Sequence, residues 1–198
     1  MACSLLLGYP DERLDDEIAG VRAGSDSLPG VLRDELESFC ATAQSWGLRA
    51  LQEHYVRTFD QRRKCALWLT YYTHGDTRAR GQAILAFREV MLRAGFEMAR
   101  EELPDHLPVV LEFCALADSD DGERLLEANR ECLEVVRTAL HSGDSPYAHL
   151  LDALLMTLPE PDERTLAAYR SMINQGPPTE MVGIGSPSGT TALTLETR

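Results

Sequence analysis

Basic side chains gather in one short part of this sequence, between residues 57 and 80. Six basic and two acidic residues there give a local formal charge of +4, although the whole chain carries −13. Because arginine forks match the geometry of phosphates and carboxylates, the segment is a candidate anion site or docking face. The alternative is a set of weak surface ion pairs with neighbouring carboxylates. The candidate contacts for an anion or a partner are Arg62, Arg63, Arg78 and Arg80.

Aromatic residues are interleaved with these cations. Phe59, Trp68, Tyr71 and Tyr72 lie in or beside the same segment. They are candidate walls of a binding groove, but aromatic residues at helical spacing more often belong to the core. The sequence leaves both interpretations open.

A second candidate is the proline-rich stretch LPDHLP over residues 103–108. Pro104 and Pro108 predict a rigid turn rather than a continuing helix. Asp105 and His106, at the apex of that turn, either cap the following helix or orient one another. Catalysis by such a pair also needs a nucleophile or a metal within reach, so a hydrolase using Asp105 and His106 is the weakest hypothesis.

No motif of a known catalytic type accompanies these residues. The chain contains no G-x-S-x-G, no glycine-rich phosphate loop before a lysine, no dinucleotide fingerprint and no H-E-x-x-H. Its five histidines have no metal-ligand spacing with one another. The adjacent Glu101 and Glu102 would face different directions on a helix. We therefore predict a protein that is not an enzyme and that holds no metal.

Composition narrows the class of protein further. With 198 residues and 44% apolar residues, the chain is long enough for one sizeable core. An excess of acidic residues disfavours binding to nucleic acid and attracts basic partner segments. Five widely spaced cysteines without a C-x-x-C pair indicate a reducing compartment. No apolar run reaches the roughly 20 residues of a membrane helix, and residues 1–7 lack signal-peptide features, so we expect a cytoplasmic protein without membrane insertion.

Apolar residues recur at steps of three and four along most of the chain, which predicts helices. We expect an all-α fold, a single compact bundle of about nine helices. A strand is a local rival over residues 67–73, which are rich in β-prone residues. Capping residues, glycines and prolines predict where several of these helices begin and end. The predicted helices run from Asp76 to Gly95, from Pro108 onward, from Ser119 to near Gly143 as one long helix, from Ser145 and Pro146 onward, and after Asp162 as a last short helix. Residues 1–173 would form the helical domain and residues 174–198 a flexible tail rich in Gly, Pro, Ser and Thr.

Three stretches carry a family resemblance. Residues 55–81, YVRTFDQRRKCALWLTYYTHGDTRARG, closely resemble the core signature of the respiratory nitrate reductase assembly chaperones, the delta subunits NarJ and NarW. Residues 102–113, ELPDHLPVVLEF, resemble the second signature, and their Pro-Asp-His element is shared with the wider TorD/DmsD-like chaperones of molybdoenzymes. The early LLGYPD at residues 6–11 is similar to a stretch typical of the family. The resemblance covers residues 4 to 172 or so.

The resemblance implies a TorD-like helical fold and a non-catalytic role. Such proteins bind the apo catalytic (alpha) subunit of nitrate reductase. They bind it through a short segment at the N-terminus of that subunit, which is similar to a remnant signal peptide. They assist insertion of the molybdenum cofactor and assembly of the complex. We expect a monomer or a homodimer with no tightly bound cofactor. The alternative is a carrier that itself binds the molybdopterin guanine dinucleotide through the basic segment, with the four arginines as phosphate clamps.

We expect the client-binding residues within the two matched signatures. Those in the first signature are Tyr55, Phe59, Asp60, Tyr71, Tyr72 and Asp76, and those in the second are Pro104, Asp105 and His106. An apolar groove between helices would hold an amphipathic peptide helix, and surrounding carboxylates would attract its basic residues.

Overall fold

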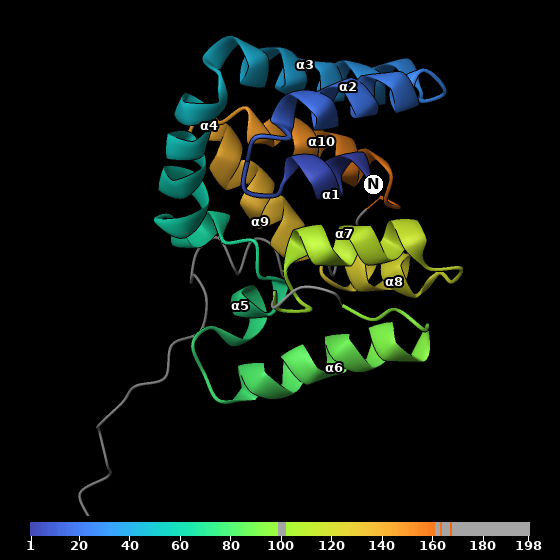
Figure 1. The fold of residues 1–198 in the computed structure, drawn as a ribbon. Helices are drawn as coiled ribbons and strands as arrows, with labels where there is room; N and C mark the ends of the chain where they lie inside the picture. The colour runs from blue at the N-terminus through green and yellow to red at the C-terminus, as the bar shows by residue number, and fades with distance from the viewer. Residues whose placement is uncertain (99–101, 161–162, 164–166, 168–198) are drawn as a thin grey trace, which may run out of the picture.

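The computed structural model describes residues 1–98 and 102–160, together with Glu163 and Ala167. These residues form ten α-helices, one π-helical turn and one 3-10 turn without a strand, so the predicted all-α bundle is confirmed (Figure 1). The elements are α1 (Ala2–Leu6), α2 (Leu14–Ser25), α3 (Gly30–Trp46), α4 (Leu48–Tyr55), the π-turn (Val56–Asp60), the 3-10 turn (Arg63–Cys65), α5 (Leu69–His74), α6 (Ala79–Arg93), α7 (Leu107–Leu116), α8 (Asp121–Ala128), α9 (Arg130–His141) and α10 (Tyr147–Met156). The tail expected at residues 174–198 lies outside the described residues, as does the last predicted helix apart from Glu163 and Ala167.

Helix α10 is the centre of the bundle. Eight of its ten residues are buried, because its sequence is apolar around most of its circumference. It packs against α3 on one side, α9 on another and α1 on a third. In Figure 1, α2 and α3 lie above α10 and α1, whereas α7 and α8 lie below them and α6 runs along the lower edge. The predicted start at Ser145 and Pro146 is confirmed within two residues.

An aromatic cluster fills the space between α10 and the α4 end of the bundle. The ring of Tyr147, at the start of α10, lies 5.0 Å from that of Phe39, 5.8 Å from that of Tyr55 and 4.9 Å from that of Phe59. Tyr55 ends α4 and Phe59 lies in the π-turn, where one extra residue per turn alters the register of the helix. His54 joins the cluster, stacked on Tyr147 and hydrogen-bonded to the Ser145 hydroxyl at 2.8 Å.

Residues 67–73 do not form the rival strand. Trp68 makes an isolated antiparallel bridge with His106, and α5 begins at the next residue. Leu69, Thr70, Tyr71 and Tyr72 are all buried in α5, which packs against α6 and α9. Burial on all sides makes a short helix the better solution, since its backbone groups are satisfied locally.

The predicted long helix from Ser119 to Gly143 is wrong, because the structure breaks it at Asn129. The Asn129 side-chain amide donates to the Leu125 carbonyl at 2.8 Å, and the Asn129 carbonyl accepts from the Cys132 N–H at 3.0 Å. The residue thus ends α8 and begins α9. Such local side-chain bonds compete with a continuous helix.

Gly122 in α8 is required by close packing on α7. A β-carbon at this position would lie 2.6 Å from the Cys114 sulfur and 2.7 Å from the Cys114 α-carbon. We expect Gly122→Ala to lower the free energy of unfolding by about 1–3 kcal/mol, because overpacking forces α8 away from α7. Gly20→Ala in α2 is the matched control, since nothing lies within 4 Å of its β-carbon, and it should be neutral or stabilising. Urea denaturation of both variants measures the difference, and equal stabilities would contradict the packing argument.

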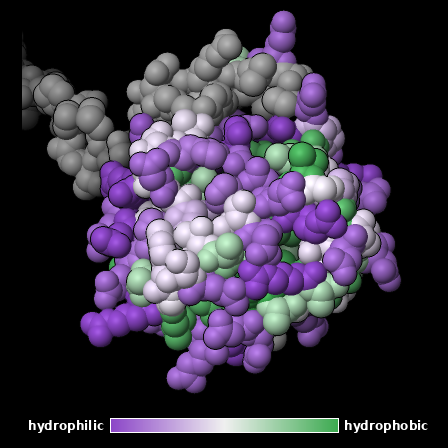
Figure 2. Space-filling view, turned by 90° about the horizontal axis from the view of Figure 1, so that it is seen from above, coloured by the Kyte–Doolittle hydropathy of each residue, from purple (hydrophilic) through white to green (hydrophobic). Residues whose placement is uncertain are grey.

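The surface is mostly polar on the α2 and α3 side. Figure 2 looks onto this side and shows hydrophilic residues over most of it, with hydrophobic surface in separate groups. Among the described residues, no helix is both long enough and apolar enough to cross a membrane.

Candidate functional site

The two matched sequence signatures meet at one buried junction. The Leu107 N–H donates to the Leu67 carbonyl at 2.8 Å, and the Leu69 N–H donates to the Asp105 carbonyl at 3.0 Å. The Asp105 Oδ2 atom accepts from the Thr70 N–H at 3.2 Å and from the Thr70 hydroxyl at 2.5 Å. Asp105 has no exposed surface, so it joins the segments and cannot contact a substrate or a client.

Arg80 completes this junction. Its Nε donates to the Thr70 hydroxyl oxygen at 3.2 Å, and its Nη2 lies 3.9 Å from Asp105 Oδ2. The guanidinium also lies over the Tyr71 ring, 5.9 Å from its centroid. Arg80 therefore compensates the negative charge of the buried Asp105 carboxylate. It does not belong to the group of exposed arginines in the basic segment.

His106 lies on the outer side of the junction, against the ring of Trp68 at 5.4 Å. Burial lowers its pKa, and the opposing effect of the Glu102 and Asp105 carboxylates is smaller. The neutral form is therefore favoured in the folded protein. His106 also lines a groove of about 380 Å³ beside α1, α2 and the start of α7, whose acidic members are Asp11, Glu17, Glu102 and Glu112.

The lowered pKa of His106 predicts a dependence of stability on pH. Below about pH 6.5 the unfolded chain binds a proton that the folded chain resists, so stability falls as the pH is lowered. We expect the free energy of unfolding, measured in urea, to fall less between pH 7.5 and 5.5 in His106→Gln than in the wild type. His74→Gln is the control and should keep the wild-type slope. An unchanged slope in His106→Gln would count against the burial argument.

The remaining cations of the basic segment are divided between two places. Arg62, Arg63 and Lys64 line a pocket of about 480 Å³ against the end of α9, which includes Ser142 and Gly143. Arg63 lies 3.7 Å from Asp76, an exposed and therefore weak pair. Arg78 precedes α6. The four arginines therefore do not line a single pocket in the described part of the chain.

An apolar groove lies at the C-terminal end of α10. It has a volume of about 630 Å³ and is bordered by α1, α3, α7, α8 and the end of α10. Its apolar lining includes Leu28, Leu32, Leu36, Leu111, Leu126, Leu154 and Leu158. Glu123 and Glu127 of α8 are the acidic members of this lining. A long apolar trough with carboxylates on one side suits an amphipathic segment that carries basic residues.

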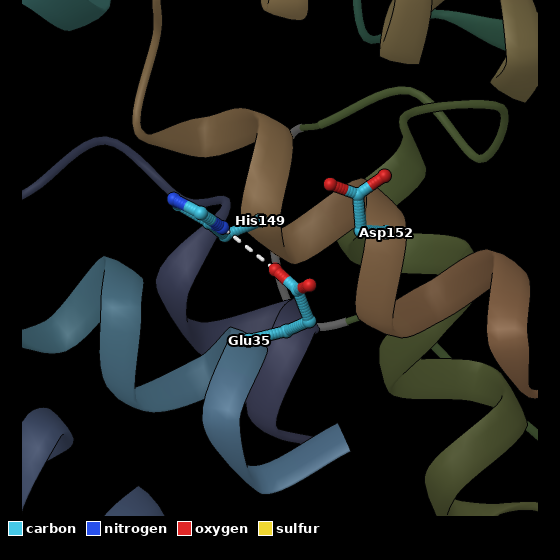
Figure 3. A group of neighbouring side chains, drawn as sticks. All are labelled: Glu35, His149 and Asp152. Atoms are coloured by element: carbon cyan, nitrogen blue, oxygen red, sulfur yellow. Dashed lines mark hydrogen bonds and ion pairs between the residues drawn. The ribbon is translucent and has the colours of Figure 1, made fainter. Parts of the chain in front are cut away.

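A group of possible metal ligands joins α3 to α10. One ligand atom each from Glu35, His149 and Asp152 lies within 4.8 Å of the others (Figure 3). His149 Nδ1 is 2.6 Å from Glu35 Oε2, but Asp152 accepts from Arg137 and lies 2.9 Å from His141 Nε2. Since a guanidinium already neutralises Asp152, a cation there would meet a like charge. We interpret the group as an ionic link between α3, α10 and α9.

Comparison with known proteins assigns the family. The sequence profile of the nitrate reductase delta subunit matches residues 25–153. The probable nitrate reductase molybdenum cofactor assembly chaperone NarJ of Bacillus subtilis (strain 168) is 35% identical over 158 residues, 79% of this chain and 86% of that protein.

This chain belongs to the nitrate reductase delta subunit family. The nitrate reductase molybdenum cofactor assembly chaperone NarJ of Escherichia coli (strain K12) is 32% identical over 155 residues, 77% of this chain and 66% of that protein. The nitrate reductase-like protein NarX of Mycobacterium tuberculosis (strain ATCC 25618 / H37Rv) is 45% identical over 158 residues. That match covers 78% of this chain but only 23% of NarX.

The structure of this delta-subunit family member places several expected client contacts inside the core. Tyr55, Phe59, Tyr71 and Tyr72 are buried, as is Asp105. Asp60 and Asp76 are exposed, Pro104 is buried, and His106 is half-buried. Most of the signature residues that we expected to contact the client therefore lie in the core and not on the accessible surface.

Sequence reasoning expected an apolar groove between helices but did not identify the residues that line it in this family member. The spacing of apolar residues places Leu32, Leu36, Leu126 and Leu154 on inward faces of separate helices. Nothing in that spacing shows that the helices leave a trough between them. Leu28, an apolar residue directly before Pro29, lines the groove, but a lone leucine before a proline does not indicate one.

Proposed function

We propose that this protein is an assembly chaperone that binds the apo catalytic subunit of a nitrate reductase through a short segment near that subunit's N-terminus. Membership of the delta subunit family and the similarity to the NarJ assembly chaperones of nitrate reductase support the identity of the client. The observation that carries the binding mode is the apolar groove between α1, α3, α7, α8 and α10. The encounter would take place in the cytoplasm, before the cofactor and the other subunits are in place.

The groove fits such a segment in chemistry. Leucines on its floor accept apolar anchors at helical spacing, and burying one anchor contributes about 1.5–3 kcal/mol. Glu123 and Glu127 face a neighbouring basic residue of the segment, which adds specificity and speeds the encounter. Groove and carboxylates together favour a peptide that is apolar on one side and basic on the other.

Substitutions in the groove test this proposal. We expect Leu28→Asp and Ala115→Glu each to weaken binding of a peptide copied from the client's N-terminus by about tenfold or more, because a charge replaces an apolar contact. Val31→Asp, in the first turn of α3, 65% exposed and outside the groove lining, is the matched control. Calorimetry at two salt concentrations provides the affinities. No detectable binding to the wild type under any condition would refute the peptide role.

A second candidate is direct binding of the molybdopterin guanine dinucleotide. The pocket lined by Arg62, Arg63 and Lys64 supports it, because three consecutive cations there can contact phosphates. In this proposal the protein holds no tightly bound cofactor but receives it during transfer. Binding of the dinucleotide that is abolished by Arg62→Glu with Arg63→Glu would favour it, and cofactor insertion that is untouched by these changes would eliminate it.

A further inference from the structure

Helix α6 is attached to the bundle along only one side. It packs against α5 and α8, and only Phe87 and Met91 of its 15 residues are buried. Figure 1 shows it along the edge of the molecule, with no described helix on its outer side. Its half-buried residues, Ile84 and Val90 among them, lie on the same inner face as Phe87 and Met91.

The outer face of α6 carries a second apolar stripe. Leu85 is 59% exposed and Leu92 is 50% exposed, and their spacing of seven residues places them on the same side, opposite Phe87. Arg88 lies between the two leucines along the helix and borders the stripe on one flank. Glu89 and Arg93 border the stripe on the opposite flank. An isolated exposed leucine is unremarkable, but two on the same side of a peripheral helix, with the exposed Arg88 and Glu89 between them, form a mixed apolar and charged face.

This stripe lies in a basic part of an acidic protein. Residues 78–93 contain four arginines and one glutamate, whereas the whole chain carries −13. Arg88 and Arg93 have no ion-pair partner among residues 1–98 and 102–160. The surface therefore suits an apolar contact bordered by carboxylates.

Two other occupants fit less well. In a two-fold antiparallel pair of α6 helices, each flank would meet the same flank of the second copy, so Arg88 would face its own equivalent. Interfacial membrane helices use a broad apolar face with several large residues, whereas this stripe offers two leucines with Glu89 beside them. An acidic protein surface satisfies both the charge and the narrow apolar stripe.

We propose that the outer face of α6, formed by Leu85, Arg88, Leu92 and Arg93, is a second docking surface that binds an acidic, apolar-centred surface on the body of the client subunit. This inference rests on the proposed function for the identity of the client. None of these residues lines the apolar groove, so the two contacts are separate. The chaperone would hold a short segment in the groove and the body of the subunit on α6.

The test compares two probes, the purified apo catalytic subunit and a synthetic peptide of its N-terminal segment. The variant Leu85→Ser/Arg88→Glu/Leu92→Ser is expected to bind the whole subunit about tenfold more weakly and the peptide as tightly as the wild type does. The matched control is Val31→Ser/Arg33→Glu on the exposed face of α3, at the opposite edge of the molecule, which should change neither affinity. Unchanged thermal unfolding of both variants establishes that the fold is intact.

Each outcome decides the proposal. A selective loss for the whole subunit supports it. An unchanged affinity for the subunit, or an equal loss for the peptide, would overturn it. Binding of the wild type to vesicles rich in anionic lipid that disappears in the α6 variant would overturn it in favour of a membrane surface. A wild type that binds the subunit but not the peptide would leave α6 in place and reject the groove proposal alone.

Discussion

Replacing Tyr147 by alanine is expected to lower the free energy of unfolding by about 3–5 kcal/mol, the range for deleting a large aromatic side chain from a core. Tyr147 has no exposed surface and packs against Phe39, Tyr55 and Phe59 at the centre of the molecule. The change would leave a cavity where α10 meets α3 and the π-turn, and rigid neighbours fill such space only in part. Urea denaturation monitored by circular dichroism measures the loss.

Tyr147→Phe separates the ring from its hydroxyl. The Tyr147 oxygen is buried without a hydrogen-bond partner in the structure, so its removal eliminates an uncompensated polar atom. We expect Tyr147→Phe to be neutral or stabilising. A large loss in the phenylalanine variant would mean that the hydroxyl has a partner and that the ring alone does not account for the effect.

The second large effect is expected at the junction of the two signatures. Asp105→Ala should cost about 3–5 kcal/mol, because Arg80 loses its buried carboxylate and the Thr70 N–H and hydroxyl lose their acceptor. Asp105→Asn, which keeps an acceptor oxygen, should cost less. Denaturation midpoints of the two variants give the comparison.

A double-mutant cycle checks the mechanism at this junction. Thr70→Val removes the hydroxyl that donates to Asp105 at 2.5 Å. Because the two side chains act through one hydrogen bond, the combined loss in the double variant should be smaller than the sum of the two single losses. Simple additivity would show that the Asp105 side chain stabilises the fold through Arg80 or through the Thr70 N–H instead.

Local sequence signals predicted several helix boundaries well. Gly95 has a φ of 76°, which favours glycine, and α6 ends two residues before it. Pro108 lies in the first turn of α7, as proline's fixed φ and missing N–H allow. The break at Asn129 could not be predicted in this way, because it depends on a side-chain bond to the Leu125 carbonyl.

The site was harder to predict than the fold. The stretches 55–81 and 102–108 were singled out as the candidate site, and the structure joins them through Leu67 and Leu107, whereas their role in client binding stays a prediction. Their chemistry was assigned to the surface, whereas Asp105 has no exposed surface and Tyr72 is buried. Residue spacing gives the inward face of one helix at a time, so it cannot reveal a trough whose walls come from α1, α3, α7, α8 and α10.

The junction at Asp105 affects which surface positions of this protein can vary in evolution. Thr70 and Asp105 lie 35 positions apart in the chain, and the segment between them includes α6. The hydrogen bond between these two residues holds the two ends of that segment together. An element held at both ends can accept new side chains on its outer face while the hydrogen bonds at its base stay unaltered. Exposed positions of α6 can thus be substituted at little risk to the aromatic centre of the bundle.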